Sequence, residues 1–260
     1  MKLRVVTTVL FAGLWLAACQ QQTVRPDSDA QTGELGSPLA ARSPADIYIE
    51  LSAAYLKERR LDEAFKNAQK AVLVDGSSSN AHYMLALVQQ SLGQNAAADA
   101  AFRKSIELDR RNPNALNAYG GFLCGLGKFE PADQQFRQAL TNPLYATPWV
   151  SLHNAGACHE RAGDATAAEA DYRAALQINP RFGASLLGMA RVSFASGSYL
   201  STRAYLQRYA EVAEHTAESL WLGVRTENQL GDSDQMATYS LKLRARFPDS
   251  DEAKYLQSIE

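Results

Sequence analysis

The chain has 260 residues, of which 46% are hydrophobic and 21% are charged, a composition typical of a water-soluble globular protein. Its 26 basic and 28 acidic residues nearly balance, which argues against a nucleic-acid binder because such proteins normally carry a basic stripe. Without Lys2 and Arg4, which belong to a predicted leader, 24 basic residues face 28 acidic ones, a weak acidity that indicates no particular partner.

The first nineteen residues have the pattern of a bacterial export signal. Two positive charges lie in Met1–Arg4, an almost wholly apolar run covers Val5–Trp15, and the sequence Leu-Ala-Ala-Cys ends at Cys19. The apolar run is too short for a mature transmembrane helix. The Leu-Ala-Ala-Cys string resembles the lipobox of bacterial lipoproteins, which implies a signal peptide over 1–18 and lipidation of Cys19. The alternative is a plain secretory leader that happens to end near a cysteine.

The segment 19–43 is predicted to be a flexible tether behind the lipid. It is rich in Gln, Gly, Pro and Ser and has few bulky apolar residues, so it cannot bury enough surface to fold. As a random coil, about 24 residues reach on the order of 25–30 Å. Acyl chains would hold the protein at a membrane, each contributing roughly 0.8 kcal/mol per buried methylene. In bacterial lipoproteins a residue other than Asp after the cysteine, here Gln20, implies sorting to the outer membrane, facing the periplasm.

A helical repeat begins near Asp46, and its clearest copy contains the string Leu116–Cys124. A turn glycine follows at Gly127, and small and aromatic residues then alternate at Ala132, Phe136 and Ala139. This alternation of small and large residues is typical of a tetratricopeptide (TPR) repeat, in which small residues lie where two helices approach closely.

The repeat predicts about six helix-turn-helix units over 44–260. The small residue of the first helix recurs at spacings of 34, 34, 36, 34 and 34, at Ser52, Ala86, Gly120, Gly156, Ala190 and Val224. A turn glycine follows in five of the six units. The fifth unit is degraded, because Thr202 and Leu206 replace the usual alanine and aromatic residue. We therefore expect an all-α TPR superhelix, an α-α solenoid with one concave groove, closed by a last helix after Pro248.

Cys124 and Cys158 remain once Cys19 is assigned to lipid, an even number in an oxidising compartment. They fall in the first helices of the third and fourth units, which are neighbours in a TPR stack. A disulfide between them is the leading interpretation, and two buried thiols are the alternative.

No motif for catalysis or metal binding stands out. The sequence lacks a Gly-x-Ser-x-Gly elbow, a P-loop, a Rossmann fingerprint and a His-Glu-x-x-His pair. The set His153, Cys158, His159 and Cys124 could be drawn as a zinc site, but its spacings do not place the ligands on one helix face. We predict a protein that is not an enzyme, with no cofactor, no metal, no nucleic-acid partner and no small-molecule substrate.

The groove of a TPR stack is lined by the first helix of each unit, and partner binding is expected there. Reading the groove positions off the repeat gives a predicted binding set: Ile49, Leu56, Tyr83, Leu87, Asn114, Asn117, His153, Arg191, Trp221 and Arg225. Its N-terminal half is apolar and its C-terminal half is more basic and polar, which suits an extended segment or a helix. We expect Tyr83→Ala with Leu87→Ala to weaken binding with little loss of melting temperature.

The lipobox, the six repeats, the string Asn117–Cys124 and the second cysteine at Cys158 are together similar to the type IV pilus biogenesis/stability lipoproteins, the PilF/PilW-type pilotins. The resemblance covers essentially the whole mature chain. It implies an outer-membrane adaptor that binds the type IV pilus secretin subunit, promotes its localisation and multimerisation, and so supports pilus biogenesis and twitching motility. The alternative is a TPR lipoprotein that scaffolds peptidoglycan hydrolases or β-barrel assembly.

Overall fold

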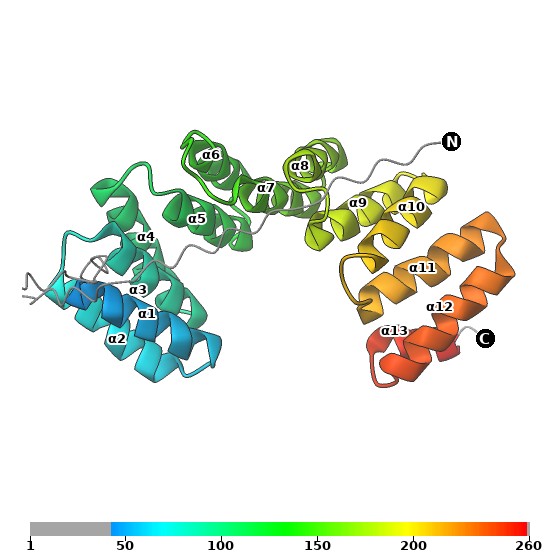
Figure 1. Cartoon of the computed structure of the whole chain (residues 1–260), viewed down its shortest axis with the longest axis horizontal. Helices are drawn as coiled ribbons and strands as arrows, with labels where there is room; N and C mark the ends of the chain where they lie inside the picture. The colour runs from blue at the N-terminus through cyan, green and yellow to red at the C-terminus, as the bar shows by residue number, and fades with distance from the viewer. Residues whose placement is uncertain (1–42, 259–260) are drawn as a thin grey trace, which may run out of the picture. The chain divides into compact units, whose positions relative to one another are not determined.

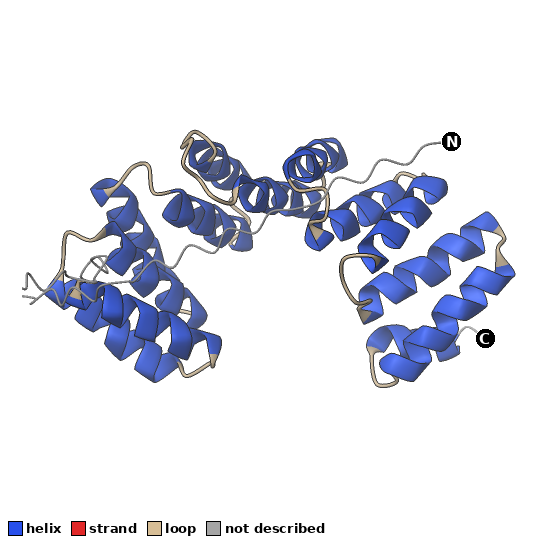
Figure 2. Ribbon diagram, viewed as in Figure 1, coloured by secondary structure: helices blue, strands red, loops and turns tan. Residues whose placement is uncertain are grey.

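The computed structural model describes residues 43–258, which form thirteen α-helices and no strand (Figures 1 and 2). The helices are α1 (Pro44–Lys57), α2 (Leu61–Val74), α3 (Ser79–Ser91), α4 (Asn95–Leu108), α5 (Pro113–Gly125), α6 (Phe129–Ala139), α7 (Pro148–Ala162), α8 (Ala165–Ile178), α9 (Gly183–Ala195), α10 (Tyr199–Ala210), α11 (Ala217–Leu230), α12 (Ser233–Arg246) and α13 (Asp251–Ser258). The predicted leader over 1–18, Cys19 and almost all of the predicted tether lie outside the described residues.

The predicted all-α solenoid is confirmed. Each of the first six odd-numbered helices packs against the even-numbered helix that follows it, giving six helical hairpins in chain order (Figure 1). Consecutive odd-numbered helices also contact one another, from α1 through to α13. They therefore form a continuous row, which is the wall expected of a TPR groove. None of the helices within residues 43–258 is long and apolar enough to cross a bilayer.

Local sequence explains where the helices begin and end. Ser43 caps α1, because its hydroxyl accepts a hydrogen bond from the Asp46 amide while the Asp46 carboxylate accepts one from the Ser43 amide. In five hairpins the turn glycine has a positive φ, between 73° and 83°. The first hairpin places Arg59 there instead, at φ 59°, a conformation that a residue with a side chain rarely adopts.

The core depends on glycines that face aromatic rings. A Cβ added to Gly120 on α5 would lie 2.7 Å from the ring of Phe136 on α6, a residue with no exposed surface. Tyr172 on α8 is likewise fully buried, and a Cβ on Gly156 or on Gly188 would lie within 3 Å of its ring. Gly156 belongs to the same hairpin as Tyr172 and Gly188 to the next, so one ring fills the space between two repeats.

The two extra residues of the fourth spacing lie in the linker between α6 and α7. The linker is packed rather than loose, because Tyr145 is buried against Leu116 and Ala139. The Asn142 side-chain amide donates to the Arg111 carbonyl oxygen at 2.8 Å.

At the C-terminal end of the array, the predicted last helix forms as α13. The Ser250 hydroxyl accepts a hydrogen bond from the Ala253 amide at 3.2 Å and so caps its first turn.

The neighbouring glycines of α5 provide a matched test of this packing. Gly120→Ala forces a methyl group against the buried Phe136 ring and is expected to lower the free energy of unfolding by about 1–3 kcal/mol. Gly121→Ala meets nothing within 4 Å and should raise stability by about 0.5–1 kcal/mol, because alanine loses less backbone entropy in a helix. Thermal melts of the two variants check the opposite signs. Equal melting temperatures would contradict the role given to Gly120.

Candidate protein-binding groove

All ten residues of the predicted binding set lie on odd-numbered helices. Ile49 and Leu56 are on α1, Tyr83 and Leu87 on α3, Asn114 and Asn117 on α5, His153 on α7, Arg191 on α9, and Trp221 and Arg225 on α11. Asn114 and Arg225 are exposed, and the other eight are partly buried. The repeat position therefore places the whole set on the row of odd-numbered helices, while the accessibility of each side chain depends on its neighbours.

The apolar half of the set is integrated into the core. Leu56 and Leu87 pack against the buried cluster of α2 and α3 that contains Ala68 and Val88. Tyr83 packs against the next cluster, around Phe102, and burial raises the pKa of its hydroxyl. Alanine at Tyr83 and Leu87 would remove core contacts, so the double substitution is now expected to lower the melting temperature as well as to weaken binding.

The middle of the groove is polar and hydrogen-bonded. The Asn154 side-chain amide donates to Asn117 Oδ1 at 3.0 Å, which links α7 to α5. His153 Nδ1 lies 3.2 Å from Ser185 Oγ on α9, and its ring contacts Tyr172 and Phe182. Burial, with a smaller contribution from the Arg191 guanidinium, lowers the pKa of His153 to about 4. The imidazole is therefore neutral near pH 7.

Arg191 is already engaged within the chain. Its guanidinium donates to both carboxylate oxygens of Glu160, at 2.8 and 2.9 Å, and to Glu218 at 3.2 Å. The Tyr172 hydroxyl donates to the same Glu160 carboxylate at 2.7 Å. These contacts join α7, α8, α9 and α11, so Arg191 positions groove helices and its charge is neutralised. Glu160 was not in the predicted set, because pairing between repeats is not encoded in the repeat period.

The C-terminal end of the groove contains a hollow. Trp221 and Arg225 line this hollow of about 540 Å³ between α9, α11 and α13. Phe194 and Asn228 also line it from the first helices α9 and α11. Tyr199 and Tyr255 lie on α10 and on the closing helix, so the groove positions of the repeat could not identify them. Tyr255 meets Trp221 edge-on, with ring centroids 5.4 Å apart.

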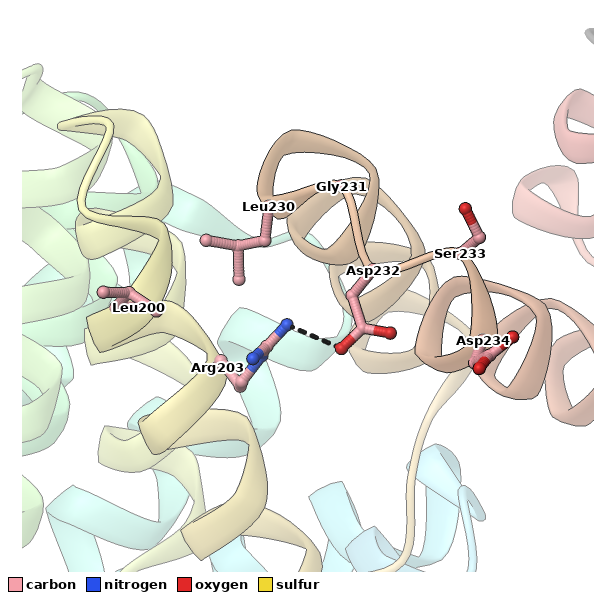
Figure 3. Close-up of a pocket in the computed structure, with 7 residues that line it drawn as sticks. All are labelled: Leu200, Arg203, Leu230, Gly231, Asp232, Ser233 and Asp234. Carbon is pink, nitrogen blue, oxygen red and sulfur yellow. Dashed lines mark hydrogen bonds and ion pairs between the residues drawn. The ribbon is translucent and has the colours of Figure 1, made fainter.

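Another hollow, outside this wall, lies where the N-terminal part of α10 meets the turn between α11 and α12 (Figure 3). Its one cation, Arg203, pairs with Asp232 at 3.2 Å and with the buried carboxylate of Glu227. The charge that could attract a ligand is therefore already balanced. These contacts instead attach α10 to α11 and its following turn.

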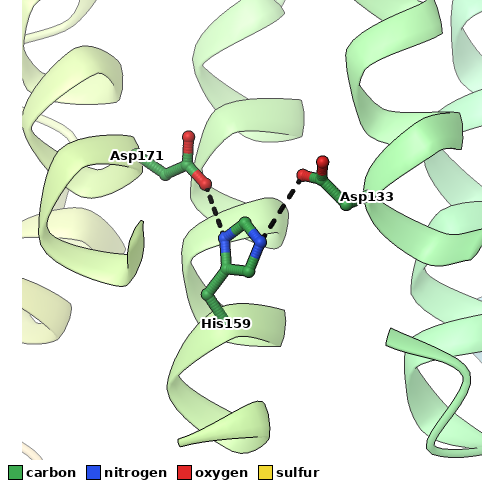
Figure 4. A group of neighbouring side chains, drawn as sticks. All are labelled: Asp133, His159 and Asp171. Carbon is green, nitrogen blue, oxygen red and sulfur yellow. Dashed lines mark hydrogen bonds and ion pairs between the residues drawn. The ribbon is translucent and has the colours of Figure 1, made fainter. Parts of the chain in front are cut away.

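A His-carboxylate cluster is formed by Asp133, His159 and Asp171 (Figure 4). His159 Nδ1 lies 2.9 Å from Asp171 Oδ2, and Arg137 donates to both oxygens of the same carboxylate at 2.7 and 2.8 Å. A metal ion there would compete with this guanidinium for the Asp171 carboxylate and would lie close to its positive charge. The arrangement therefore fits an ion network between α6, α7 and α8 better than a metal centre.

Cys124 on α5 and Cys158 on α7 are joined by a disulfide, with their Cα atoms 5.8 Å apart. The bond links first helices of consecutive units and lies within the cluster around Phe102 and Phe136. Both sulfur atoms are thereby unavailable to the zinc arrangement considered from the sequence.

The hairpin array and its continuous wall of first helices define a TPR protein, a class whose concave surfaces bind other proteins. A sequence profile described as tetratricopeptide repeat matches residues 79–112 and 151–182. The chain is 31% identical over 213 residues to the type IV pilus assembly protein PilF of Pseudomonas aeruginosa, and the match covers 82% of this chain and 84% of that protein.

Two solved structures extend this relationship. A structure of Pseudomonas aeruginosa PilF superposes with a TM-score of 0.74 at 30% identity, covering 83% of this chain and 97% of that one. The crystal structure of PilW, a widely conserved type IV pilus biogenesis factor, gives a TM-score of 0.76 at 27% identity, covering 84% and 100%. The chain therefore belongs to the PilF/PilW family of type IV pilus biogenesis factors.

The disulfide gives a stability prediction. Closing a loop with a sequence separation of 34 residues stabilises the fold by roughly 3–4 kcal/mol on the chain-entropy argument. Reduction, or Cys124→Ser with Cys158→Ser, should lower the unfolding midpoint accordingly. Thiol labelling of the unreduced, denatured protein followed by mass spectrometry should leave both cysteines unmodified. Full labelling at both positions would show that the bond is absent.

Acid should weaken the fold through His153. Its pKa is about 4 in the folded chain against an ordinary 6.5, so on acidification the unfolded chain takes up this proton first. The stability contributed by the neutral imidazole is present above about pH 6.5 and is lost progressively as pH falls from 6.5 toward 4. His153→Gln, which keeps a hydrogen-bonding group but does not titrate, should lose less melting temperature than the wild type over this interval.

A residual acid sensitivity is expected in that variant, because burial also lowers the pKa of His215. His153→Gln with His215→Gln should therefore flatten the profile further. Identical pH profiles for the wild type and both variants would contradict the assignment.

Proposed function

We propose that this protein is an outer-membrane lipoprotein, facing the periplasm, that binds the type IV pilus secretin subunit and promotes its outer-membrane localisation and multimerisation. In this role it is a pilotin that supports pilus biogenesis and twitching motility. The observation that carries the proposal is the 31% identity to PilF across 82% of the chain. The predicted signal peptide over 1–18, followed by Cys19, supports it.

The proposed mechanism uses three parts of the chain. Acyl chains on Cys19 attach the protein to the outer membrane, and the segment 19–43 gives the helical array reach from the bilayer. The helical array spans residues 44–258, and its row of odd-numbered helices then binds a segment of the secretin subunit. No covalent step is involved, since the protein acts by holding its partner at the membrane where the pore assembles.

The groove is suited to an extended or helical segment rather than to a small molecule. Its first helices present a long row of side chains that changes from apolar near α1 and α3 to polar and aromatic near α9 and α11. A segment lying along this row can place apolar side chains at one end and hydrogen-bonding groups at the other. The inter-helix contacts of Arg191 and the Cys124–Cys158 disulfide hold the wall in place beforehand, which reduces the entropy lost on binding.

Genetic complementation tests the proposal. Deleting the gene in its native host should leave secretin subunits as monomers in detergent extracts and abolish twitching. The wild-type gene should restore heat-resistant secretin multimers in the outer membrane. Cys19→Ser should produce a folded protein that fails to reach that membrane, because the acyl anchor is missing.

Normal secretin multimers in the deletion strain would contradict the secretin role. In that case, affinity purification of the wild-type protein from solubilised membranes would be informative. Peptidoglycan hydrolases or β-barrel assembly proteins in place of secretin would identify the other class of partner.

A further inference from the structure

Two adjoining hollows lie on either side of one ridge of α11. Trp221, Arg225 and Asn228 are spaced by four and three residues, so they lie on one face of the helix and line both hollows. The first hollow, toward α9, also contains Phe194 and Tyr199. The second, of about 360 Å³, is floored by apolar side chains, among them Val224, Met236 and Leu256.

Arg225 is a cation fixed in position without a counter-charge. Its guanidinium carbon lies 4.2 Å from the centroid of the Phe194 ring, and its side chain is exposed. Within residues 43–258, no carboxylate lies within ion-pair distance of it. Arg191 and Arg203, by contrast, each pair with two carboxylates. Stacking on an aromatic face orients the planar guanidinium and leaves its N–H groups available to a carboxylate.

Aromatic and apolar surface lies directly beside this cation. Trp221 and Tyr255 meet edge-on at the rim of the first hollow, and Tyr255 is 56% exposed. The Asn228 side chain adds an amide to the same rim. Trp, Tyr and Arg are the residue types that most often dominate the energy of protein interfaces, particularly when they surround a pocket.

We propose that this end of the groove, the site formed by Phe194, Trp221, Arg225, Asn228 and Tyr255, binds an Asp or Glu side chain of a partner segment that also carries a neighbouring apolar side chain. Charge complementarity selects the acidic group, because Arg225 is the unneutralised cation at the rim and its fork of donors matches a carboxylate. The second hollow accepts the apolar side chain.

This site is separate from the apolar wall of α1 and α3 and would act as a second anchor that fixes the register of the segment. The inference rests on the proposed function, because it deepens the binding role assigned to the groove.

Site-specific photo-cross-linking in the native host tests the site with the full chain. Gln229, an exposed residue of the first hollow, is replaced by p-benzoylphenylalanine, and the cross-linked segment is identified by mass spectrometry. The same probe at Gln90 reports partner binding elsewhere in the groove, because this exposed residue is spaced seven and three residues from Tyr83 and Leu87 and so shares their face of α3. Arg225→Gln removes the cation. Arg208→Gln is the matched control, an arginine over the Tyr205 ring on α10 and outside the hollows.

The expected product from position 229 is a segment containing an Asp or Glu residue beside an apolar one. Arg225→Gln should reduce its yield about tenfold, the loss expected for a hydrogen bond to a charged group, while Arg208→Gln leaves it unchanged. A cross-link that persists in Arg225→Gln, or a segment without an acidic residue, would overturn the site. Cross-linking from Gln90 but not from Gln229 would also overturn the site while leaving the groove function intact, whereas failure at both positions would refute both.

Discussion

The rest of the array depends on helix backbones that pack directly against large aromatic rings. At Gly120, Gly156 and Gly188 there is no room for a Cβ, because the rings of Phe136 and Tyr172 occupy that volume. A ring can fill the space between two helices only if the facing residue has no side chain. The alternation of small and large residues therefore sets the distance between packed helices. This packing in turn places the first helices that line the groove.

Tyr172 connects this packing to the groove. Its ring lies against glycines of two consecutive hairpins, and its hydroxyl donates to Glu160, which in turn accepts from Arg191. Burial and the Glu160 carboxylate raise the pKa of this hydroxyl, so it remains a donor. One buried side chain thus aligns α7, α8 and α9 and fixes the arginine at the groove surface. The Cys124–Cys158 disulfide provides a comparable link between α5 and α7.

The repeat period predicted the architecture well because it is a local property repeated along the chain. Spacings near 34 residues identified the hairpins and placed the binding set on the odd-numbered helices, and five turn glycines adopt the expected positive φ. The period could not predict which side chains meet across repeats. The engagement of Arg191 by Glu160, the burial of Tyr145 by the longer linker and the approach of Tyr255 to Trp221 all depend on three-dimensional neighbours. Arg59 likewise occupies a glycine position that sequence alone would not assign.

We infer that the protein partner lies along the row of odd-numbered helices. Hydrogen–deuterium exchange of the full chain, with and without the purified secretin subunit, tests it directly. Added protection is expected in α3, α9 and α11, with little change in α4, α10 and α12, which lie outside the row. Protection concentrated on the even-numbered helices, or no change on any helix, would contradict it.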